Sequence, residues 1–217
     1  SSGEWKAMVA DKAARTTFAK NIKTVLEKNK LDGIDLDFEW AENEKEYKDY
    51  SLAILKMREV LGDKYLFSVS LHPVCYKISK EAIEAVDFIS LQCYGPSPVR
   101  FPIEKYCSDI QMVLEYGIPK EKLVAGVPFY GVTKDNSKKT EAYFNFVQNG
   151  LVTSPAQNEV IYQGDTYVFD GQDNIRIKTR YAKEQKLKGM MSWDLATDLP
   201  LSDSRSLLKT MTEELRE

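Results

Sequence analysis

Hydrophobic residues recur at helical spacing in several segments of this chain. Ala14, Phe18, Ile22 and Val25 follow one another at steps of four, four and three, which predicts an amphipathic helix that ends near Lys30. Similar stripes predict helices over 47–61, 79–86, 103–116, 174–187 and 206–215. Glycines 62, 117 and 189 follow three of these stripes, as expected where a helix ends.

Between these helices lie short apolar segments that predict strands. They read LDGIDLDFEW, YLFSVSL, FISLQCY, KLVAGVP and GMMSW. Strands that alternate with helices of this length favour βαβ units and a parallel sheet, either doubly wound or closed as a barrel. Neither a GxGxxG nor a P-loop motif follows any of the strands, so the nucleotide-binding signals of doubly wound folds are missing. The pattern therefore favours a barrel.

Residues 132–172 break the alternation of strands and helices. They are polar, rich in aromatic residues and weakly periodic, with a hairpin predicted around YVFDGQ. We interpret this segment as an insertion in a loop of a single, partial barrel domain that spans 1–217.

Composition narrows the class of protein and of partner. The 217 residues are 43% hydrophobic and 29% charged, enough for a sizeable core. The 30 Lys and Arg and 33 Asp and Glu are scattered, which argues against a nucleic-acid or anionic-membrane partner and favours a neutral substrate. No apolar run approaches the roughly 18 residues of a membrane-spanning helix. Because Ser1 begins the chain, we expect that a signal peptide or longer segment precedes it.

The first predicted strand carries the candidate chemistry. Three acidic residues alternate with three apolar ones: Asp35, Asp37 and Glu39 with Ile34, Leu36 and Phe38. Residues at alternate positions share one face, about 7 Å apart at ~3.3 Å per residue. In a barrel the apolar face packs on helices and the acidic face points inward, with Glu39 at the mouth where active sites lie. Clustered carboxylates cannot all ionise cheaply, so we expect one to hold a proton near neutral pH and to supply a general acid.

Two other interpretations of this strand remain open. A solvated amphipathic strand would show the same alternation, but a parallel sheet buried on both faces argues against it. A magnesium or calcium site would also need clustered oxygen ligands, but no further acidic cluster with ligand spacing accompanies the strand. We therefore expect neither a metal nor a cofactor.

Cysteine and histidine offer little other chemistry. Cys75, Cys93 and Cys107 match neither a zinc site nor a CxxC motif, and Cys93 lies in an apolar run that predicts a buried thiol. A Cys75–Cys107 bridge is conceivable from the count alone. His72 is the single histidine, which argues against a Ser-His-Asp triad. We expect His72 to serve in packing or to lie at the rim of a cleft.

LDGIDLDFEW resembles the DGxDxDxE signature of glycoside hydrolase family 18, which includes chitinases, endo-β-N-acetylglucosaminidases and catalytically inactive lectins. Three further segments are similar in order and spacing: SSGEW to the end of the family's third strand, GVPFYG to its seventh and MMSWDLATD to its eighth. The resemblance implies a TIM (β/α)8 barrel whose strands 1, 2 and most of 3 are missing, with the insertion between strands 7 and 8. Such a barrel typically needs ~250 residues, so we expect this chain to be part of a longer one.

The resemblance also implies a retaining, substrate-assisted mechanism, in which the acetamido oxygen of the substrate attacks its own anomeric carbon. Glu39 matches the general acid, Asp37 the group that orients the acetamide, and Asp35 the carboxylate that shares the proton. Tyr94 matches the tyrosine that hydrogen-bonds the acetyl oxygen, and Trp193 the floor beneath the distorted sugar. Four further aromatic residues extend that surface or serve ordinary packing: Trp5, Trp40, Phe129 and Tyr130.

The sequence departs from the family pattern at Gly95, where many members carry an acid or an amide after the tyrosine. That difference implies lowered activity, a shifted pH dependence or membership in a different subgroup of the family. We expect a hydrolase of β-1,4-linked N-acetylglucosamine polymers such as chitin. The alternatives are an endo-β-N-acetylglucosaminidase acting on N-glycan cores and a sugar-binding pseudoenzyme. A secreted, periplasmic or cell-surface location and a monomeric state are the natural expectations for such an enzyme.

Overall fold

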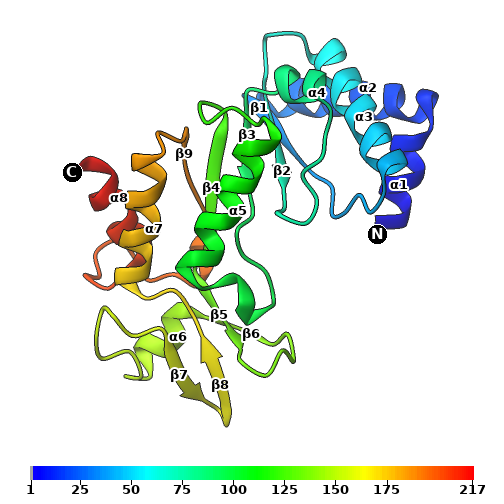
Figure 1. The fold of residues 1–217 in the computed structure, drawn as a ribbon. Helices are drawn as coiled ribbons and strands as arrows, with labels where there is room; N and C mark the ends of the chain where they lie inside the picture. Colours follow the sequence, from blue (N-terminus) through cyan, green and yellow to red (C-terminus); the bar gives the residue numbers. More distant parts are fainter. Residues whose placement is uncertain (1) are drawn as a thin grey trace. The chain divides into compact units, whose positions relative to one another are not determined.

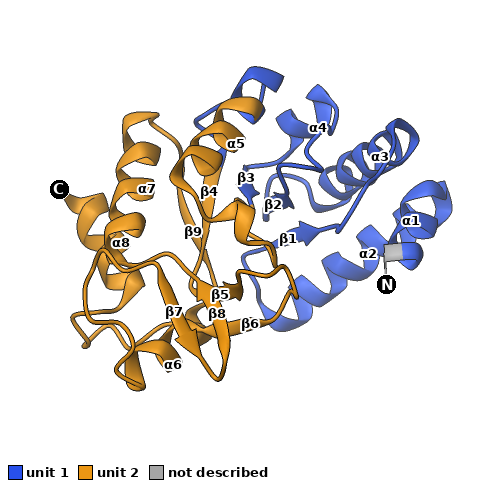
Figure 2. Ribbon diagram, turned by 60° about the horizontal axis from the view of Figure 1, so that its bottom comes forward, with its two compact units in different colours: residues 1–91, 113–123 blue, residues 92–112, 124–217 orange. Residues whose placement is uncertain are grey.

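The computed structural model describes residues 2–217, without the side chain of Ser2. The chain forms two compact units, coloured separately in Figure 2. Unit 1 contains the residues up to Leu91 together with Val113–Leu123, and unit 2 contains Gln92–Met112 and Val124–Glu217. Each unit combines parallel strands with helices, as the alternation of segments predicts.

Unit 1 is built on three parallel strands in the order β1-β2-β3 (Figure 1). They are β1 (Gly33–Asp37), β2 (Leu66–Leu71) and β3 (Phe88–Leu91). The helices of this unit are α1 (Ser2–Ala10), α2 (Lys12–Asn29), α3 (Glu44–Leu61), α4 (Lys80–Ala85) and the end of α5 (Ile103–Tyr116). α1 and α2 both pack against α3.

Side-chain caps fix where the helices of unit 1 begin. The Asn43 side chain accepts a hydrogen bond from the Glu46 amide at 3.0 Å and so caps α3. The Glu46 carboxylate in turn accepts the amide of Glu42 at 2.8 Å, whereas a capping box would use the amide of Asn43 itself. α3 ends at Leu61 and is capped by Gly62, whose φ of 64° favours glycine.

The structure corrects the prediction that SSGEW forms the tail of a strand. Residues 2–5 of this segment belong to helix α1, and Ser1 lies outside the described residues. Trp5 and Val9 lie four residues apart on one helical face, Val9 is fully buried, and the Trp5 ring packs on Phe18 and Phe38. The packing of Trp5 on Phe18 and Phe38, with Val9 buried on the same helical face, favours the helix.

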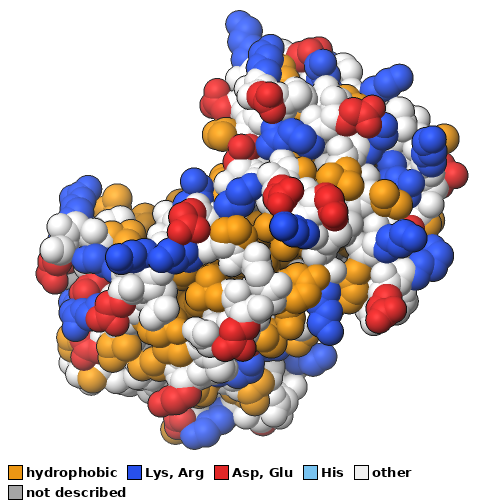
Figure 3. Space-filling model, turned by 45° about the horizontal axis from the view of Figure 1, so that its top comes forward, with side chains coloured by type: hydrophobic (Ala, Val, Ile, Leu, Met, Phe, Trp, Pro, Cys, Tyr) orange, Lys and Arg blue, Asp and Glu red, His pale blue; other side chains and the backbone are white. Residues whose placement is uncertain are grey.

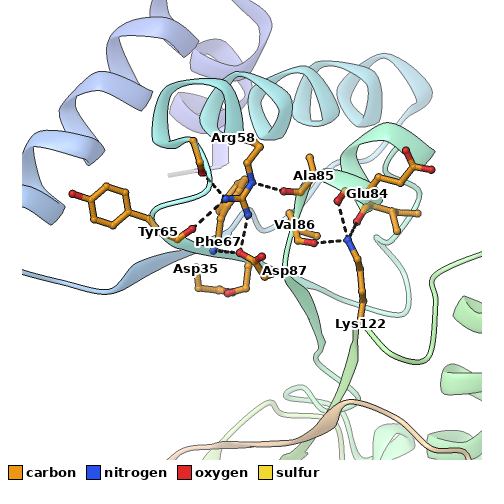
Figure 4. Close-up of polar contacts among 12 residues, drawn as sticks. Asp35, Arg58, Tyr65, Phe67, Glu84, Ala85, Val86, Asp87 and Lys122 are labelled. Carbon is orange, nitrogen blue, oxygen red and sulfur yellow. Dashed lines mark hydrogen bonds and ion pairs between the residues drawn. The ribbon is translucent and has the colours of Figure 1, made fainter.

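A polar cluster closes the amino ends of β2 and β3, opposite the end where β1 leads to Glu39 (Figure 4). Lys122 Nζ donates to the carbonyl oxygens of Ile83, Glu84 and Val86 at 3.0, 2.8 and 2.6 Å, respectively. All three donors of the ammonium group are therefore used on the last carbonyls around α4. Arg58 donates to the carbonyl of Ala85 and pairs with Asp87 at 2.7 Å.

Unit 2 contains the parallel pair β4 (Leu123–Pro128) and β9 (Gly189–Trp193). Its helices are the start of α5, α7 (Gln172–Glu184) and α8 (Leu207–Arg216), with short 3-10 turns at Pro98–Arg100 and Leu195–Thr197. α7 packs against α8 and ends before the predicted residue 187, since Lys186 adopts a left-handed φ of 57°. Lys178 on α7 is completely buried, paired with Asp170 at 2.6 Å and bonded to the Phe101 carbonyl at 2.9 Å.

The predicted insertion is an antiparallel sheet in the order β6-β5-β8-β7. The elements are β5 (Tyr130–Thr133), β6 (Thr140–Ala142), α6 (Tyr143–Gln148), β7 (Glu159–Tyr162) and β8 (Asp165–Val168). Phe146 packs against Tyr162, Tyr167 and Phe169, which explains the aromatic content of the segment. The hairpin turns at Gln163 and Gly164, slightly before YVFDGQ. A single barrel domain over 1–217 stays a prediction.

The surface carries charges of both signs side by side, without a field of one sign on the face in Figure 3. Among residues 2–217, no helix is both long enough and apolar enough to cross a membrane.

Candidate active site

Strand β1 separates acidic from apolar side chains as the sequence predicts. Leu36 and Phe38 are buried, whereas Asp35, Asp37 and Glu39 are exposed. Glu39 stands two residues beyond the carboxyl end of β1. The alternation therefore places the three carboxylates on one face that leads to the end of the strand.

The neighbouring strand β2 holds the first of these carboxylates. Ser68 and Ser70 are nearly buried, and their hydroxyl groups donate to Asp35 Oδ1 at 2.6 Å and Asp35 Oδ2 at 2.8 Å. In the parallel register, Ser68 lies opposite Asp35 and Ser70 opposite Asp37. Sequence reasoning missed both serines, although their spacing of two in YLFSVSL already places them on one face of β2.

The opposite face of β1 is packed by aromatic rings. The Tyr50 hydroxyl donates to the Leu36 carbonyl at 3.2 Å, and its ring meets Phe38 edge-on at 5.1 Å. Burial, followed by the nearby charges of Asp35 and Asp37, raises the pKa of Tyr50 well above its usual value. Tyr50 is thus a neutral phenol that anchors the backbone of β1 from α3.

Trp5 belongs to this packed face. Its ring stacks on Phe38 at 5.9 Å, and Phe38 has the opposite parity to Glu39. Of the two roles expected for Trp5, these contacts favour packing on the helix-facing side of β1.

Trp40 follows Glu39 directly and is half-buried. Its ring contacts the ring of His72 at 4.7 Å, and His72 Nδ1 accepts the amide hydrogen of Val74 at 3.2 Å. His72, the single histidine, directly follows the carboxyl end of β2 and packs on Trp40. Of the two places expected for it, packing or the rim of a cleft, this contact favours packing. The peptide bonds Glu39–Trp40 and Trp193–Asp194 are both cis.

In unit 2, Tyr94 is 7% exposed and its hydroxyl lies 3.6 Å from Met191 Sδ. Its ring meets the half-buried ring of Tyr130 edge-on at 6.4 Å. Phe129, next to Tyr130, is completely buried. Of the two roles expected for Phe129, its burial favours packing in the core.

Trp193 ends β9 with 56% of its surface exposed. It borders a cavity of about 280 Å³ in unit 2 that Tyr130 also lines. The remaining lining residues are Pro96, Thr140, Glu141, Ala142, Asp194 and Thr197. An exposed indole beside polar groups is suited to stack on the apolar face of a sugar and to leave its hydroxyl groups bonded.

Metal-ligating clusters and cysteine thiols are the remaining candidates for chemistry. No group of three or more His, Cys, Asp or Glu side chains is placed to hold a metal ion within the described range 2–217. The cysteines are free thiols. Cys93 is fully buried, as predicted, and burial raises the pKa of its thiol.

A family model, "Glycosyl hydrolases family 18", matches residues 1–198. The chain belongs to this family. A curated relative, "Probable chitinase 2" of Drosophila melanogaster, is 23% identical over 91% of this chain and 54% of its own length. Another, "Chitinase A1" of Niallia circulans, is 23% identical over 91% of this chain and 39% of its own length. The chain thus spans about half the length of these relatives or less.

Among solved structures, the GH18 chitinase ChiB of Flavobacterium johnsoniae has a TM-score of 0.81 at 27% identity, with 98% of this chain and 69% of that chain covered. Its similarity confirms the predicted fold class, an α/β arrangement of the family 18 barrel type with a parallel sheet.

Proposed function

We propose that this chain carries the catalytic part of a retaining glycoside hydrolase that cleaves β-1,4-linked N-acetylglucosamine polymers, with Glu39 as the general acid. The observation that carries the proposal is the exposed acidic face of β1, on which Asp35 and Asp37 lead to Glu39 beyond the end of the strand. Membership in glycosyl hydrolases family 18 supports it.

In the first step, the carboxyl group of Glu39 gives its proton to the glycosidic oxygen. The acetamido oxygen of the substrate attacks the anomeric carbon, the bond to the leaving sugar breaks, and an oxazolinium ion forms. Asp37 accepts the acetamide N–H and stabilises this cation, while Tyr94 orients the acetyl oxygen. The hydroxyl groups of Ser68 and Ser70 keep Asp35 fixed behind Asp37.

In the second step, the Glu39 carboxylate takes a proton from water as the water oxygen attacks the anomeric carbon. The ring of the intermediate opens, the acetamide is restored, and the product keeps the configuration of the substrate. Trp193 would support the sugar from below. We further propose that Trp40 and Tyr130 contact neighbouring sugars, and that the enzyme is secreted and acts as a monomer.

A non-catalytic sugar-binding role is the second candidate. The chitinase-like agglutinin RobpsCRA of Robinia pseudoacacia shares the fold, with a TM-score of 0.81 at 18% identity over 98% of this chain and 76% of that chain. Gly95 after Tyr94 favours this alternative, because it removes the polar group that many family members carry there.

Product analysis by mass spectrometry separates these candidates. The full-length protein is incubated with chitin oligosaccharides and with a high-mannose glycopeptide, and the anomer formed first is read by NMR. We expect shorter chitin oligosaccharides in the β configuration. Cleavage of the glycopeptide alone would favour the N-glycan core, whereas binding without products would support the agglutinin-like role.

A further inference from the structure

The backbone directly after Glu39 is held by the loop that follows strand β2. The Trp40 ring contacts the His72 ring at 4.7 Å, and the Ala41 amide donates a hydrogen bond to the sulfur atom of Cys75 at 3.2 Å. Two consecutive residues after the predicted acid are therefore tied to two residues of one short loop, and both contacts lie within unit 1.

The loop that provides these contacts is itself fixed. The amide of Cys75 donates to the carbonyl of His72 at 2.7 Å, which closes 72–75 into a tight turn. The hydroxyl group of Tyr47 on α3 donates to the Val74 carbonyl at 3.4 Å. The turn thus connects the residues that follow Glu39 to strand β2 and helix α3.

The packing of Cys75 and His72 suits a structural anchor. Cys75 is 3% exposed and His72 is 8% exposed, so neither presents a reactive group to solvent. Burial raises the pKa of the Cys75 thiol, so the sulfur that accepts the Ala41 amide is uncharged. Glu39, in contrast, is exposed at the end of a strand. A side chain in that place depends on its backbone neighbours for a fixed position.

We propose that Cys75 and His72 are positioning residues for Glu39: through Ala41 and Trp40 they fix where the Glu39 carboxyl group stands beyond β1. The inference rests on the proposed role of Glu39 as the general acid. Neither residue touches the substrate in this account.

The test uses the full-length protein and the variants Cys75→Ala and Cys75→Ser, with Cys107→Ala as the matched control. Serine keeps an acceptor for the Ala41 amide, and Cys107 is a half-buried thiol on α5 with no role in the proposed turn. Two quantities are measured: the rate of amide hydrogen exchange at Ala41, and kcat and KM for a chitin oligosaccharide. Circular dichroism verifies folding.

In Cys75→Ala, exchange at Ala41 should be about tenfold faster, because one hydrogen bond is lost. The kcat should fall about 10- to 100-fold with KM within about twofold, because the acid is displaced and binding is retained. Cys75→Ser should recover most of both effects, and Cys107→Ala should match the wild type. Unchanged exchange, or faster exchange with unchanged kcat, would overturn the inference.

Two further outcomes keep the inference separate from the proposed function. If the wild type hydrolyses nothing, the proposed function fails, and the positioning role falls with it. If Cys75→Ala does not fold, the kcat values of His72→Phe and His72→Ala test the positioning role instead. Phenylalanine keeps a ring beside Trp40 and should preserve kcat, whereas alanine should lower it. Equal kcat values for these two variants would overturn the role of His72.

Discussion

The hydroxyl group of Ser68 on β2 donates a hydrogen bond of 2.6 Å to the carboxylate of Asp35 on β1. Together with Ser70 it fixes both oxygens of that carboxylate. We expect Ser68→Ala with Ser70→Ala to lower kcat for chitin oligosaccharides about tenfold or more. Hydrogen bonds to a charged group are worth about 1.5–3 kcal/mol each, and about 1.4 kcal/mol changes a rate tenfold.

Steady-state kinetics of the double variant provides the measurement. The control is Ser108→Ala, since that hydroxyl group bonds to the Lys105 carbonyl on the exposed side of α5. A double variant with the kcat of the wild type would show that the fixed carboxylate of Asp35 is dispensable.

Replacement of Trp193 by alanine should weaken binding without unfolding the protein. The indole is 56% exposed, so its loss removes contact area for a sugar rather than core packing. Stacked aromatic contacts contribute about 0.5–1.5 kcal/mol beyond the burial of area, so we expect oligosaccharide affinity to fall about tenfold. Calorimetric titration of Trp193→Ala in a Glu39→Gln background measures this without turnover.

Trp5 provides the opposite case for comparison. Because it packs between Phe18 and Phe38, Trp5→Ala should lower the free energy of unfolding by about 2 kcal/mol or more. Its folded fraction should bind oligosaccharide like the parent protein. Reduced affinity in folded Trp5→Ala, with full affinity in Trp193→Ala, would reverse the two assignments.

These two tryptophans illustrate what the sequence does and does not predict. The period of two in β1 places Glu39 and Phe38 on opposite faces, and the structure agrees. The resemblance of SSGEW to a strand end did not predict the environment of Trp5, because that residue lies in helix α1 and packs on Phe18 and Phe38. Phe129 and Tyr130 differ in burial although they are neighbours, and sequence did not separate them.

Contacts between segments far apart along the chain could not be predicted from the sequence. The cavity beside Trp193 combines Pro96 with Thr140 and Thr197, which are far apart along the chain. The bond from the Ala41 amide to Cys75 likewise joins two segments without any periodic signal. Periodicity predicts which face a side chain occupies, but the partner on another segment depends on tertiary packing.

The buried ion pair in unit 2 should be needed for stability. Lys178 and Asp170 are both fully buried. Lys178→Met leaves the Asp170 charge without its partner, so the free energy of unfolding should fall by about 3–5 kcal/mol. Urea denaturation measures the change, and Lys178→Met with Asp170→Asn should recover part of it. A loss under about 1 kcal/mol would mean that Asp170 finds another partner or a proton.

Asp87 should contribute a pH-dependent part of the stability of unit 1. Burial raises its pKa, but the Phe67 amide and the Arg58 guanidinium lower it more, so the net pKa lies below the usual 3.8. A carboxyl group whose pKa is lower in the folded than in the unfolded state stabilises the folded protein at a pH above the unfolded pKa. This stabilisation is lost as the pH falls through the folded pKa. The difference in free energy of unfolding between the wild type and Asp87→Asn should therefore shrink below about pH 4.

Urea midpoints of both proteins at pH 6 and at pH 3 test this dependence. Asp63→Asn is the control, because Asp63 is another carboxylate that lines the surface hollow formed by Arg58 and Asp87. A constant difference between the wild type and Asp87→Asn across this range would contradict the assignment.

The initial rate of chitin oligosaccharide hydrolysis by the full-length wild type and its Glu39→Gln variant tests the central claim most directly. Glu42→Gln is the matched control, because that exposed carboxylate pairs with Lys6 instead. General acid catalysis contributes about 10²- to 10⁴-fold, so Glu39→Gln should lose about a thousandfold in kcat with oligosaccharide binding retained. Glu42→Gln should keep the wild-type rate. A Glu39→Gln variant that hydrolyses the substrate at the wild-type rate would contradict the account.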